Sequence, residues 1–355
     1  PFKRGKKIAT MNSKYNDIEK YEAYEDLFNP LRHDRQARRQ RRPKAQHQPK
    51  KSEAEIIASA ADTIGLEGGF ETTYKPSKYE YGWLLQSLRP FYDQELISDV
   101  EALVKGGKEA NVYRCRAHPA TGQRWLAAKV YRPRMFRNLR NDKMYRQGRI
   151  TLTASGQPVK GSDTRVMRAL GKKSNFGQQV AHTSWLMHEF KALELLYGAG
   201  GAVPQAFAAS ENAILMTYFG DGAGAAPALN EIRLAANEVG PLFQKVVDNV
   251  SLMLRLGRIH GDLSAYNILY WQGDITLIDF PQVANSHVDR GTHAVGSRVN
   301  PDAAYIFERD VARVCDYFQE LGVTCDAAAL TAELWQRHVG DDKEQRLADA
   351  SLWEE

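Results

Sequence analysis

One short segment constrains this chain more than any other: the octapeptide HGDLSAYN at residues 260–267, followed after an apolar hairpin by Asp279. Asp262 and Asn267 have the D-x-x-x-x-N spacing of a phosphotransferase catalytic loop. A rigid loop between two buried strands would aim all three side chains into one cleft. A surface turn capped by Asp and Asn would explain the first two residues, but not a second acid at the end of the next strand. The pattern therefore favours a kinase-type site.

These three side chains match the requirements of phosphoryl transfer. The reaction needs an acceptor or orienter for the incoming hydroxyl, and oxygen ligands for a cation that bridges the phosphates. We expect Asp262 to accept the hydroxyl proton. We expect Asn267 and Asp279 to bind Mg²⁺, because this hard cation prefers carboxylate and amide oxygens. The predicted cofactors are ATP and Mg²⁺, with Mn²⁺ as an alternative cation.

The residues upstream have the order of a phosphate-covering turn followed by a lysine-bearing strand. The turn at residues 105–112 keeps only Gly107 and Val112 of the pattern G-x-G-x-x-G-x-V. Lys129 follows in an A-x-K strand, where we expect it to bind the α- and β-phosphates. Glu189 lies beside the apolar stripe of a predicted helix and is a candidate partner for Lys129. A solvated helix glutamate is the alternative interpretation.

Several of these segments resemble the signatures of the RIO family of atypical protein kinases. Between about Val104 and Leu321, the resembling segments are GKEANVY at 107–113, HGDLSAYN at 260–267, IDFPQ at 278–282, NP at 300–301 and FERDV at 307–311. The resemblance implies an α+β, two-lobed, protein-kinase-like fold with a small β-rich lobe and a larger, mainly helical lobe. It also implies an ATP-dependent serine/threonine kinase or ATPase that acts in maturation of the small ribosomal subunit.

The resemblance also implies residue roles. It makes Asp262 the proton acceptor, and implicates Asp279 in accepting phosphate as an acyl-phosphate. It makes residues 216–219 the hinge that holds adenine through backbone groups of Thr217 and Phe219. The full predicted site comprises catalytic Asp262, Asp279 and Lys129, metal-binding Asn267 and Asp279, and nucleotide-binding Lys108, Glu109, Ala110, Val112, Lys129, Glu189, Met216, Thr217, Phe219 and Ser264.

Two departures from ordinary protein kinases have physical consequences. Gly261 replaces the arginine of H-R-D, which removes the usual partner of an activation-loop phosphate. Pro281 replaces the glycine of D-F-G, which fixes φ near −65° and should hinder a flip of Asp279. We therefore expect control through access of substrate and nucleotide, with the basic N-terminal arm and the insertion as gates. We do not expect control by phosphorylation of the conceivable phosphosites Ser286, Thr292 and Ser297.

The chain is predicted to have four parts. Residues 1–52 form a basic, disordered extension, and residues 53–100 a helical and aromatic segment that packs on the kinase body. Residues 101–219 form the N-lobe, with a long irregular insertion at 133–182, and residues 220–355 form the C-lobe. Hydrophobic periodicity predicts strands at 103–105, 111–116, 125–131, 213–218, 268–270 and 275–278, and helices at 184–197, 241–256, 307–321 and 327–339. A capping box predicts a further short helix from Ser52.

Positive charge is concentrated in the N-terminal extension. Residues 1–52 carry a net charge of +9, whereas the rest of the chain sums to −4. Residues 31–52 hold nine Lys or Arg against one acid and have almost no apolar side chain, so we expect disorder in isolation. Clustered arginines favour contact with RNA phosphates, here ribosomal RNA or a pre-ribosomal small subunit. A solvated tail or a localisation signal is the alternative.

The three cysteines have no CxxC spacing, so neither a disulfide nor a zinc site is expected. No apolar run reaches the length of a membrane span, and no hydrophobic region follows the basic first residues. These features predict a cytoplasmic protein without a membrane partner.

Two other functions fit parts of the same pattern. A small-molecule kinase of the aminoglycoside or choline kinase type also uses H-G-D-L-x-x-x-N with I-D-F. The loop at 108–111 and Pro281-Gln282 argue against it. An RNA-binding assembly factor with a nucleotide-gated, slowly turning site is the other alternative. Stoichiometric binding without turnover would favour this factor, whereas repeated turnover on a hydroxyl substrate would favour an enzyme.

Overall fold

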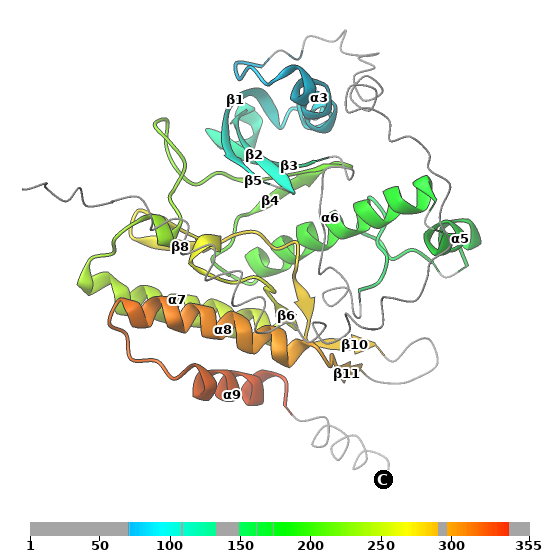
Figure 1. Cartoon of the computed structure of the whole chain (residues 1–355). Helices are drawn as coiled ribbons and strands as arrows, with labels where there is room; N and C mark the ends of the chain where they lie inside the picture. The colour runs from blue at the N-terminus through cyan, green and yellow to red at the C-terminus, as the bar shows by residue number, and fades with distance from the viewer. Residues whose placement is uncertain are drawn as a thin grey trace, which may run out of the picture. The chain divides into compact units, whose positions relative to one another are not determined.

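Five strands form one antiparallel sheet in the computed structural model, which describes residues 70, 72–107, 109–132, 149–160, 162–172, 174–289 and 297–340 (Figure 1). The strand order is β1-β2-β3-β5-β4. The strands are β1 Ile97–Gly106, β2 Ala110–Ala117, β3 Trp125–Tyr131, β4 Ala206–Ala209 and β5 Ala213–Thr217. The predicted strands of this part are present, but β1 begins six residues before the predicted start at Leu103, and β4 was not predicted.

The two faces of the sheet pack against different helices. Successive side chains of a strand point to opposite faces. On β3, Leu126, Ala128 and Val130 therefore join the core beneath α3 (Lys78–Asp93), whereas Ala127 and Tyr131 join the core that contains α6 (Asn175–Gly198). Lys129 has the parity of Ala127 and Tyr131. Lys129 therefore points to the face of the sheet that packs against the core containing α6.

Helix α3 covers the other face of the sheet. The Ser77 side chain caps its first turn by accepting a hydrogen bond from the backbone N–H of Glu80. The residues that dock it are almost completely buried: Leu84, Leu85, Leu88 and Phe91. Full burial of each such side chain contributes about 1.5–3 kcal/mol. Burial of these apolar side chains in one core with the sheet therefore holds α3 against it.

The segment between β3 and β4 differs in part from its prediction as an irregular insertion. Residues 133–148 lie outside the described residues. Residues 164–172 form helix α5 (Thr164–Lys172), and α6 begins at Asn175, nine residues before the predicted start. The prediction of irregular structure was wrong here. Helix α5 buries none of its residues, and its short apolar stripe was overlooked in a polar and basic segment. Helix α6 starts through a Ser174 cap whose side chain accepts from Gly177 N–H.

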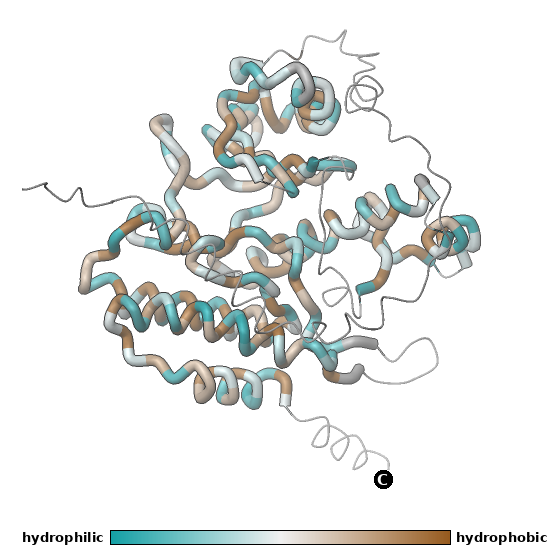
Figure 2. Tube along the Cα trace, viewed as in Figure 1, coloured by the Kyte–Doolittle hydropathy of each residue, from teal (hydrophilic) through white to brown (hydrophobic). Residues whose placement is uncertain are grey.

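Helices dominate the second half of the described chain. They are α7 Ala236–Arg255, α8 Ala303–Glu320 and α9 Ala327–His338. The predicted apolar stripe of α7 is buried: Leu242, Val246, Val250 and Met253. Helix α7 begins five residues before the predicted Pro241, because the Glu238 side chain accepts from Ala235 N–H and caps an earlier turn. Figure 2 shows hydrophobic and hydrophilic residues alternating along α7 and α8, as expected for helices with one buried face.

Short strands between α7 and α8 carry the catalytic-loop motif. The hairpin β7 (Ile268–Trp271) and β8 (Asp274–Leu277) matches the two predicted strands. Strand β6 (Arg258–Ile259) pairs with β9 (Ala284–Asn285), and β10 (His287–Asp289) pairs with β11 (Ser297–Val299). Single 3₁₀ turns lie at η3 Pro119–Thr121, η5 Leu229–Glu231 and η6 Ala265–Asn267. The motif is thus framed by paired strands on both sides.

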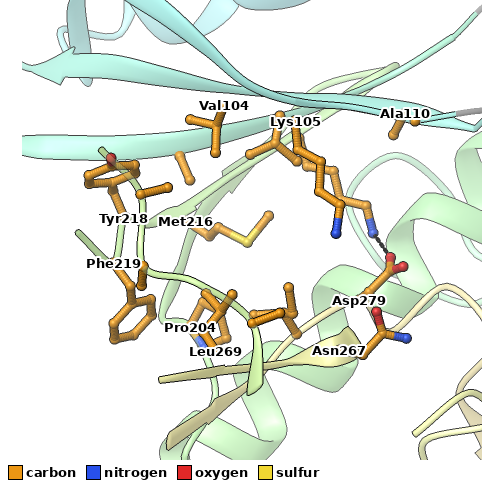
Figure 3. A pocket seen from close by; sticks show the side chains of 18 of the residues that line it. Val104, Lys105, Ala110, Pro204, Met216, Tyr218, Phe219, Asn267, Leu269 and Asp279 are labelled. Carbon is orange, nitrogen blue, oxygen red and sulfur yellow. Dashed lines mark hydrogen bonds and ion pairs between the residues drawn. The ribbon is translucent and has the colours of Figure 1, made fainter. Parts of the chain in front are cut away.

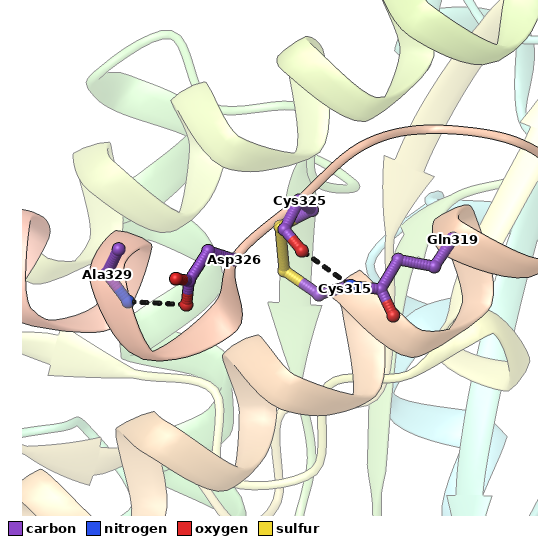
Figure 4. Close-up of a disulfide and its surroundings, with 5 residues drawn as sticks. All are labelled: Cys315, Gln319, Cys325, Asp326 and Ala329. Atoms are coloured by element: carbon purple, nitrogen blue, oxygen red, sulfur yellow. Dashed lines mark hydrogen bonds between the residues drawn. A yellow bond between two sulfur atoms is a disulfide. The ribbon is translucent and has the colours of Figure 1, made fainter.

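One cysteine prediction is wrong. Cys315 on α8 and Cys325, just before α9, form a disulfide with a Cα–Cα distance of 5.9 Å (Figure 4). The odd number of cysteines and the lack of CxxC spacing did not reveal it, because the chain reverses after α8 and brings together two thiols that are 10 residues apart in sequence. Cys115 is buried and free. Within the described residues no group of three or more His, Cys, Asp or Glu side chains could hold a metal ion, and no helix has the length and apolarity to cross a membrane.

The observed architecture agrees with the predicted fold class. An antiparallel sheet precedes a mainly helical region, which is the α+β arrangement of a two-lobed kinase-like fold. The basic extension at 1–52 and the helix predicted from Ser52 lie outside the described residues. The proposed domain boundaries stay predictions.

Candidate active site

A cavity of about 740 Å³ separates the sheet from the loops around β7 and β8 (Figure 3). This volume is within the usual range for a small-molecule or cofactor site. The cavity is lined by most of the predicted site residues: Glu109, Ala110, Val112, Lys129, Glu189, Met216, Thr217, Phe219, Asp262, Asn267 and Asp279. Two predicted residues are not placed there. Lys108 lies outside the described residues, and Ser264 is 4% exposed and does not line the cavity.

Lys129 connects two acidic residues from distant parts of the chain. Its Nζ lies 2.6 Å from Oε1 of Glu189 on α6 and 2.5 Å from Oδ1 of Asp279 after β8. Tyr131, two residues along β3, donates its hydroxyl to the other carboxylate oxygen of Glu189. Glu189 is therefore the buried partner of Lys129, and its alternative interpretation as a solvated helix glutamate is wrong. Breaking such a buried pair by removing one member typically costs about 3–5 kcal/mol.

Burial and charge act in opposite directions on the pKa values of this triad. Burial alone would lower the pKa of Lys129, but the carboxylates of Asp279 and Glu189 together raise it. Burial raises the pKa of Glu189 despite the nearby Lys129 ammonium. Burial would also raise the pKa of Asp279, but the charge and hydrogen bond of Lys129 lower it overall. The pKa of Asp279 thus favours its carboxylate form.

Asp262 is positioned by contacts from both sides of its loop. The amide nitrogen of Asn267 donates to the backbone carbonyl of Asp262 at 2.8 Å. Arg313 on α8 places Nη1 2.9 Å from Oδ1 of Asp262. Burial raises the pKa of Asp262, and the positive charge of Arg313 opposes this effect. The side chain is still 30% exposed, so it can meet a substrate hydroxyl from the cavity.

The structure explains why glycine occupies position 261. Gly261 has a φ of +85°, and a Cβ there would lie 2.3 Å from the carbonyl oxygen of Gln282. Its N–H donates to Asp310 Oδ2 at 2.7 Å, and its carbonyl accepts from Arg309. A side chain at this position therefore conflicts with the backbone after Asp279. The arginine of an ordinary kinase cannot replace Gly261 without rearrangement.

The segment after β8 holds Asp279 in an uncommon backbone conformation. Asp279 has a φ of +71°, which is unfavourable for a residue with a Cβ. The next residue, Phe280, is fully buried, and its ring centroid lies 4.5 Å from that of His260. Arg149 donates to the carbonyls of Pro281 and Val283. These contacts fix the turn and stabilise the conformation of Asp279.

The predicted hinge lies at the opposite end of the cavity from Asp279 (Figure 3). Thr217 N–H donates to the Gln205 carbonyl at 2.9 Å, and the Phe219 carbonyl accepts from Ala226 N–H at 2.9 Å. These two bonds occupy the Thr217 N–H and the Phe219 carbonyl. Met216 and Leu269 add apolar surface from two sides.

Asn267 and Asp279 fit a magnesium ion by the chemistry of their side chains. The two lie next to each other at one end of the cavity (Figure 3). Because the amide nitrogen of Asn267 donates to Asp262, its amide oxygen is the atom that remains for a cation. One carboxylate and one amide supply only two ligands, but water and substrate phosphates usually complete the coordination shell of Mg²⁺. The donor set therefore suits a cation that arrives with a nucleotide.

Sequence reasoning missed several charged residues of the site, among them Lys105 and Arg313. Lys105 lines the cavity, although the sequence pattern treated it only as a replacement for a motif glycine. Arg313 contacts Asp262 across 51 positions of sequence, a separation that no local motif reveals. For Lys105 the signal was its place at the end of a strand that precedes the glycine turn.

One of the three conceivable phosphosites is inaccessible. Ser286 is 0% exposed, and its hydroxyl lies 2.9 Å from Nδ1 of His287. Thr292 and the side chain of Ser297 lie outside the described residues. A kinase could not reach Ser286 without local unfolding.

Comparisons with known proteins agree with this geometry. The family model described as RIO domain matches residues 111–330. The chain is 27% identical over 243 residues to the serine/threonine-protein kinase RIO1 of Chaetomium thermophilum, and 27% identical over 233 residues to the RIO-type serine/threonine-protein kinase Rio1 of Haloferax volcanii. It is 25% identical over 230 residues to the serine/threonine-protein kinase RIO1 of Homo sapiens.

These matches cover 65%, 64% and 64% of this chain, and 41%, 66% and 34% of the relatives' own lengths, in the same order. The chain thus spans less than two thirds of each of these relatives. The RIO domain model nevertheless covers more than half of the chain and includes the catalytic loop, the lysine strand and the Asp279 turn. The protein belongs to the RIO family.

Proposed function

We propose that the chain is an ATP- and Mg²⁺-dependent phosphotransferase that works as a serine/threonine protein kinase, an ATPase, or both. One observation carries the proposal: Lys129 bridges Glu189 and Asp279 at one end of a cavity that Asp262 and Asn267 also line. This is the set of side chains that phosphoryl transfer requires. The names of the relatives, which are serine/threonine-protein kinases, support the same activity.

Each residue has a proposed role. Thr217 and Phe219 hold adenine through backbone groups, with Met216 against the ring. Glu109, Ala110 and Val112 cover the phosphates, and Lys129, which Glu189 holds, binds the α- and β-phosphates. Lys108 and Ser264 stay predicted ligands without structural support. Asn267 and Asp279 bind Mg²⁺, with Mn²⁺ as the alternative cation. Either cation, when bound, would neutralise negative charge on the phosphates. Asp262 accepts the proton of the attacking hydroxyl. Asp279 is also the proposed site of an acyl-phosphate.

A role in maturation of the small ribosomal subunit is a further part of the proposal. It rests on the family resemblance and on the net charge of +9 in residues 1–52, which suits contact with RNA phosphates. Cytoplasmic location belongs to the same proposal. The disulfide between Cys315 and Cys325 does not support that location, because disulfides are rare in reducing compartments.

The test follows the γ-phosphate of labelled ATP. The full chain is incubated with labelled ATP and Mg²⁺ in the presence of ribosomal particles, a generic protein substrate or an aminoglycoside. Label on protein hydroxyls supports a protein kinase, and label released as phosphate supports an ATPase. Label on the aminoglycoside would favour a small-molecule kinase. ATP that is bound stoichiometrically but never cleaved would favour a nucleotide-gated assembly factor and contradict the proposed enzyme.

A further inference from the structure

The cavity contains a second lysine, which no part of the mechanism above uses. Among the described residues that line the cavity, the acids are Glu109, Glu189, Glu231, Asp262 and Asp279, and the lysines are Lys105 and Lys129. Lys129 already contacts two carboxylates. Its single positive charge is therefore more than balanced before any nucleotide binds. A bound ATP brings several more negative charges to the same end of the cavity.

The register of the sheet places the two lysines on one face. Lys105 of β1 is paired with Val112 of β2, and Val112 is paired with Lys129 of β3. Residues directly opposite each other on neighbouring strands point to the same face. Adjacent strands lie about 4.8 Å apart, so the two lysines start about 10 Å from each other. All three residues line the cavity, and Figure 3 shows the Lys105 side chain directed into it, toward the end that holds Asp279.

The Lys105 ammonium has no ion-pair partner among the described residues, in contrast to Lys129. Its charge nevertheless acts at the site, since it contributes to lowering the pKa of Asp279. Lys105 is exposed, so its side chain can move toward a ligand without leaving a buried anion unpaired.

The backbone that carries Lys105 is held by a chain of hydrogen bonds. Gly107 N–H donates to Asn111 Oδ1 at 3.3 Å, and Asn111 Nδ2 donates to the Tyr113 hydroxyl at 3.0 Å. The Tyr113 hydroxyl in turn donates to Glu80 of α3. Each group donates in the same direction, which strengthens the chain. The end of β1 is therefore fixed relative to the sheet, and the Lys105 side chain is presented from a defined backbone position.

We propose that Lys105 is a second phosphate-binding cation of the nucleotide site, in addition to Lys129, with its ammonium contacting the phosphate chain. The inference rests on the proposed function and adds to it a ligand for the phosphates of ATP. It also assigns a division of labour. Lys129 binds phosphate from a position that two acids hold, and Lys105 adds positive charge that none of the described acids pairs with.

The test compares nucleotides that differ in phosphate content. Dissociation constants of ATP and adenosine are measured by calorimetry for the parent chain and for Lys105→Met, Lys105→Arg and Lys191→Met. Lys191 is an exposed lysine paired with Glu194 on α6, and it does not line the cavity. Hydrogen bonds to charged groups are worth enough that Lys105→Met should weaken ATP about tenfold or more. Adenosine binding should be unchanged, Lys105→Arg should retain most of the ATP affinity, and Lys191→Met should match the parent.

The outcomes separate this inference from the proposed function. If the parent chain binds no ATP, the proposed function fails and the inference fails with it. If the parent binds ATP and Lys105→Met binds it equally well, the inference alone is overturned. An equal loss of ATP and adenosine affinity would also overturn it, because the lysine would then act on the shape of the site and not on phosphate. Thermal melting of Lys105→Met near the parent value confirms that the variant is folded.

Discussion

Replacement of Gly261 by alanine should destabilise the protein by much more than its backbone conformation alone requires. The φ of +85° costs a residue with a Cβ about 1–2 kcal/mol. A Cβ would also lie 2.3 Å from the Gln282 carbonyl oxygen, and relieving such overpacking typically costs about 1–3 kcal/mol. We therefore expect Gly261→Ala to lower the free energy of unfolding by about 2–5 kcal/mol. Turnover should also fall, because the displaced Gln282 carbonyl belongs to the turn that follows Asp279.

Gly273→Ala is the matched control. Gly273 has a φ of +83°, nearly that of Gly261, but a Cβ there would meet nothing within 4 Å. It should therefore lose only the backbone contribution of about 1–2 kcal/mol. Equilibrium urea unfolding, compared at equal m values, measures both variants. If Gly261→Ala is no more destabilised than Gly273→Ala, then the close approach of the catalytic loop to Gln282 does not exclude a side chain, and our explanation of the missing arginine is wrong.

Three further predictions concern the charges of the site and the arm. Arg313→Gln should move the acidic limb of the pH–rate profile to higher pH: Arg313 opposes the burial-induced rise in the pKa of Asp262, so its loss raises that pKa further and leaves more Asp262 protonated at a given pH. If the acidic limb of the pH–rate profile stays at the same pH, Arg313 does not influence the ionisation of Asp262. Lys129→Met should cost about 3–5 kcal/mol in urea unfolding, because Glu189 is left buried without its cation. Adding Glu189→Gln should recover part of this loss, and a further loss would contradict the pairing argument. Deletion of residues 1–52 should flatten the salt dependence of RNA binding by about 0.7 log units per lost single-strand contact, with ATP affinity unchanged. If the salt dependence of RNA binding does not change, residues 1–52 do not contact RNA phosphates.

The sequence predicted elements well where burial gives a regular pattern. Strand β3 was predicted at its observed bounds, because the run Trp125–Tyr131 is buried on both faces and is almost wholly apolar. The stripe of α7 was predicted for the same reason. Helix α5 was missed although its apolar residues Val166, Met167 and Leu170 recur at helical spacing, because the segment around it is polar and basic and was interpreted as irregular. The early start of α6 depends on the Ser174 cap, a local feature that its polar and Gly-containing first turns obscured.

The candidate site shows the same division. Local motifs located Asp262, Asn267 and Asp279, since their spacing is short and their chemistry is distinctive. Contacts between distant segments could not be read from spacing: Arg313 reaches Asp262 only because α8 packs behind the catalytic loop, and Cys325 meets Cys315 only after the chain reverses. Lys105 was overlooked because it occupies a position where the motif has glycine. Only the pairing of the strands places its side chain on the face that lines the cavity.

The most direct test of the central claim is single-turnover cleavage of γ-labelled ATP by the parent chain and by Asp262→Asn. ATP affinity is measured in parallel, and Asp274→Asn serves as the control because Asp274 pairs with Lys245 and does not line the cavity. Removal of a general base typically costs about 10²–10⁴-fold in rate. We predict a loss in that range for Asp262→Asn with ATP affinity retained, and parent-like turnover for Asp274→Asn. Parent-like cleavage by Asp262→Asn would contradict the assignment of this cavity as the site of phosphoryl transfer.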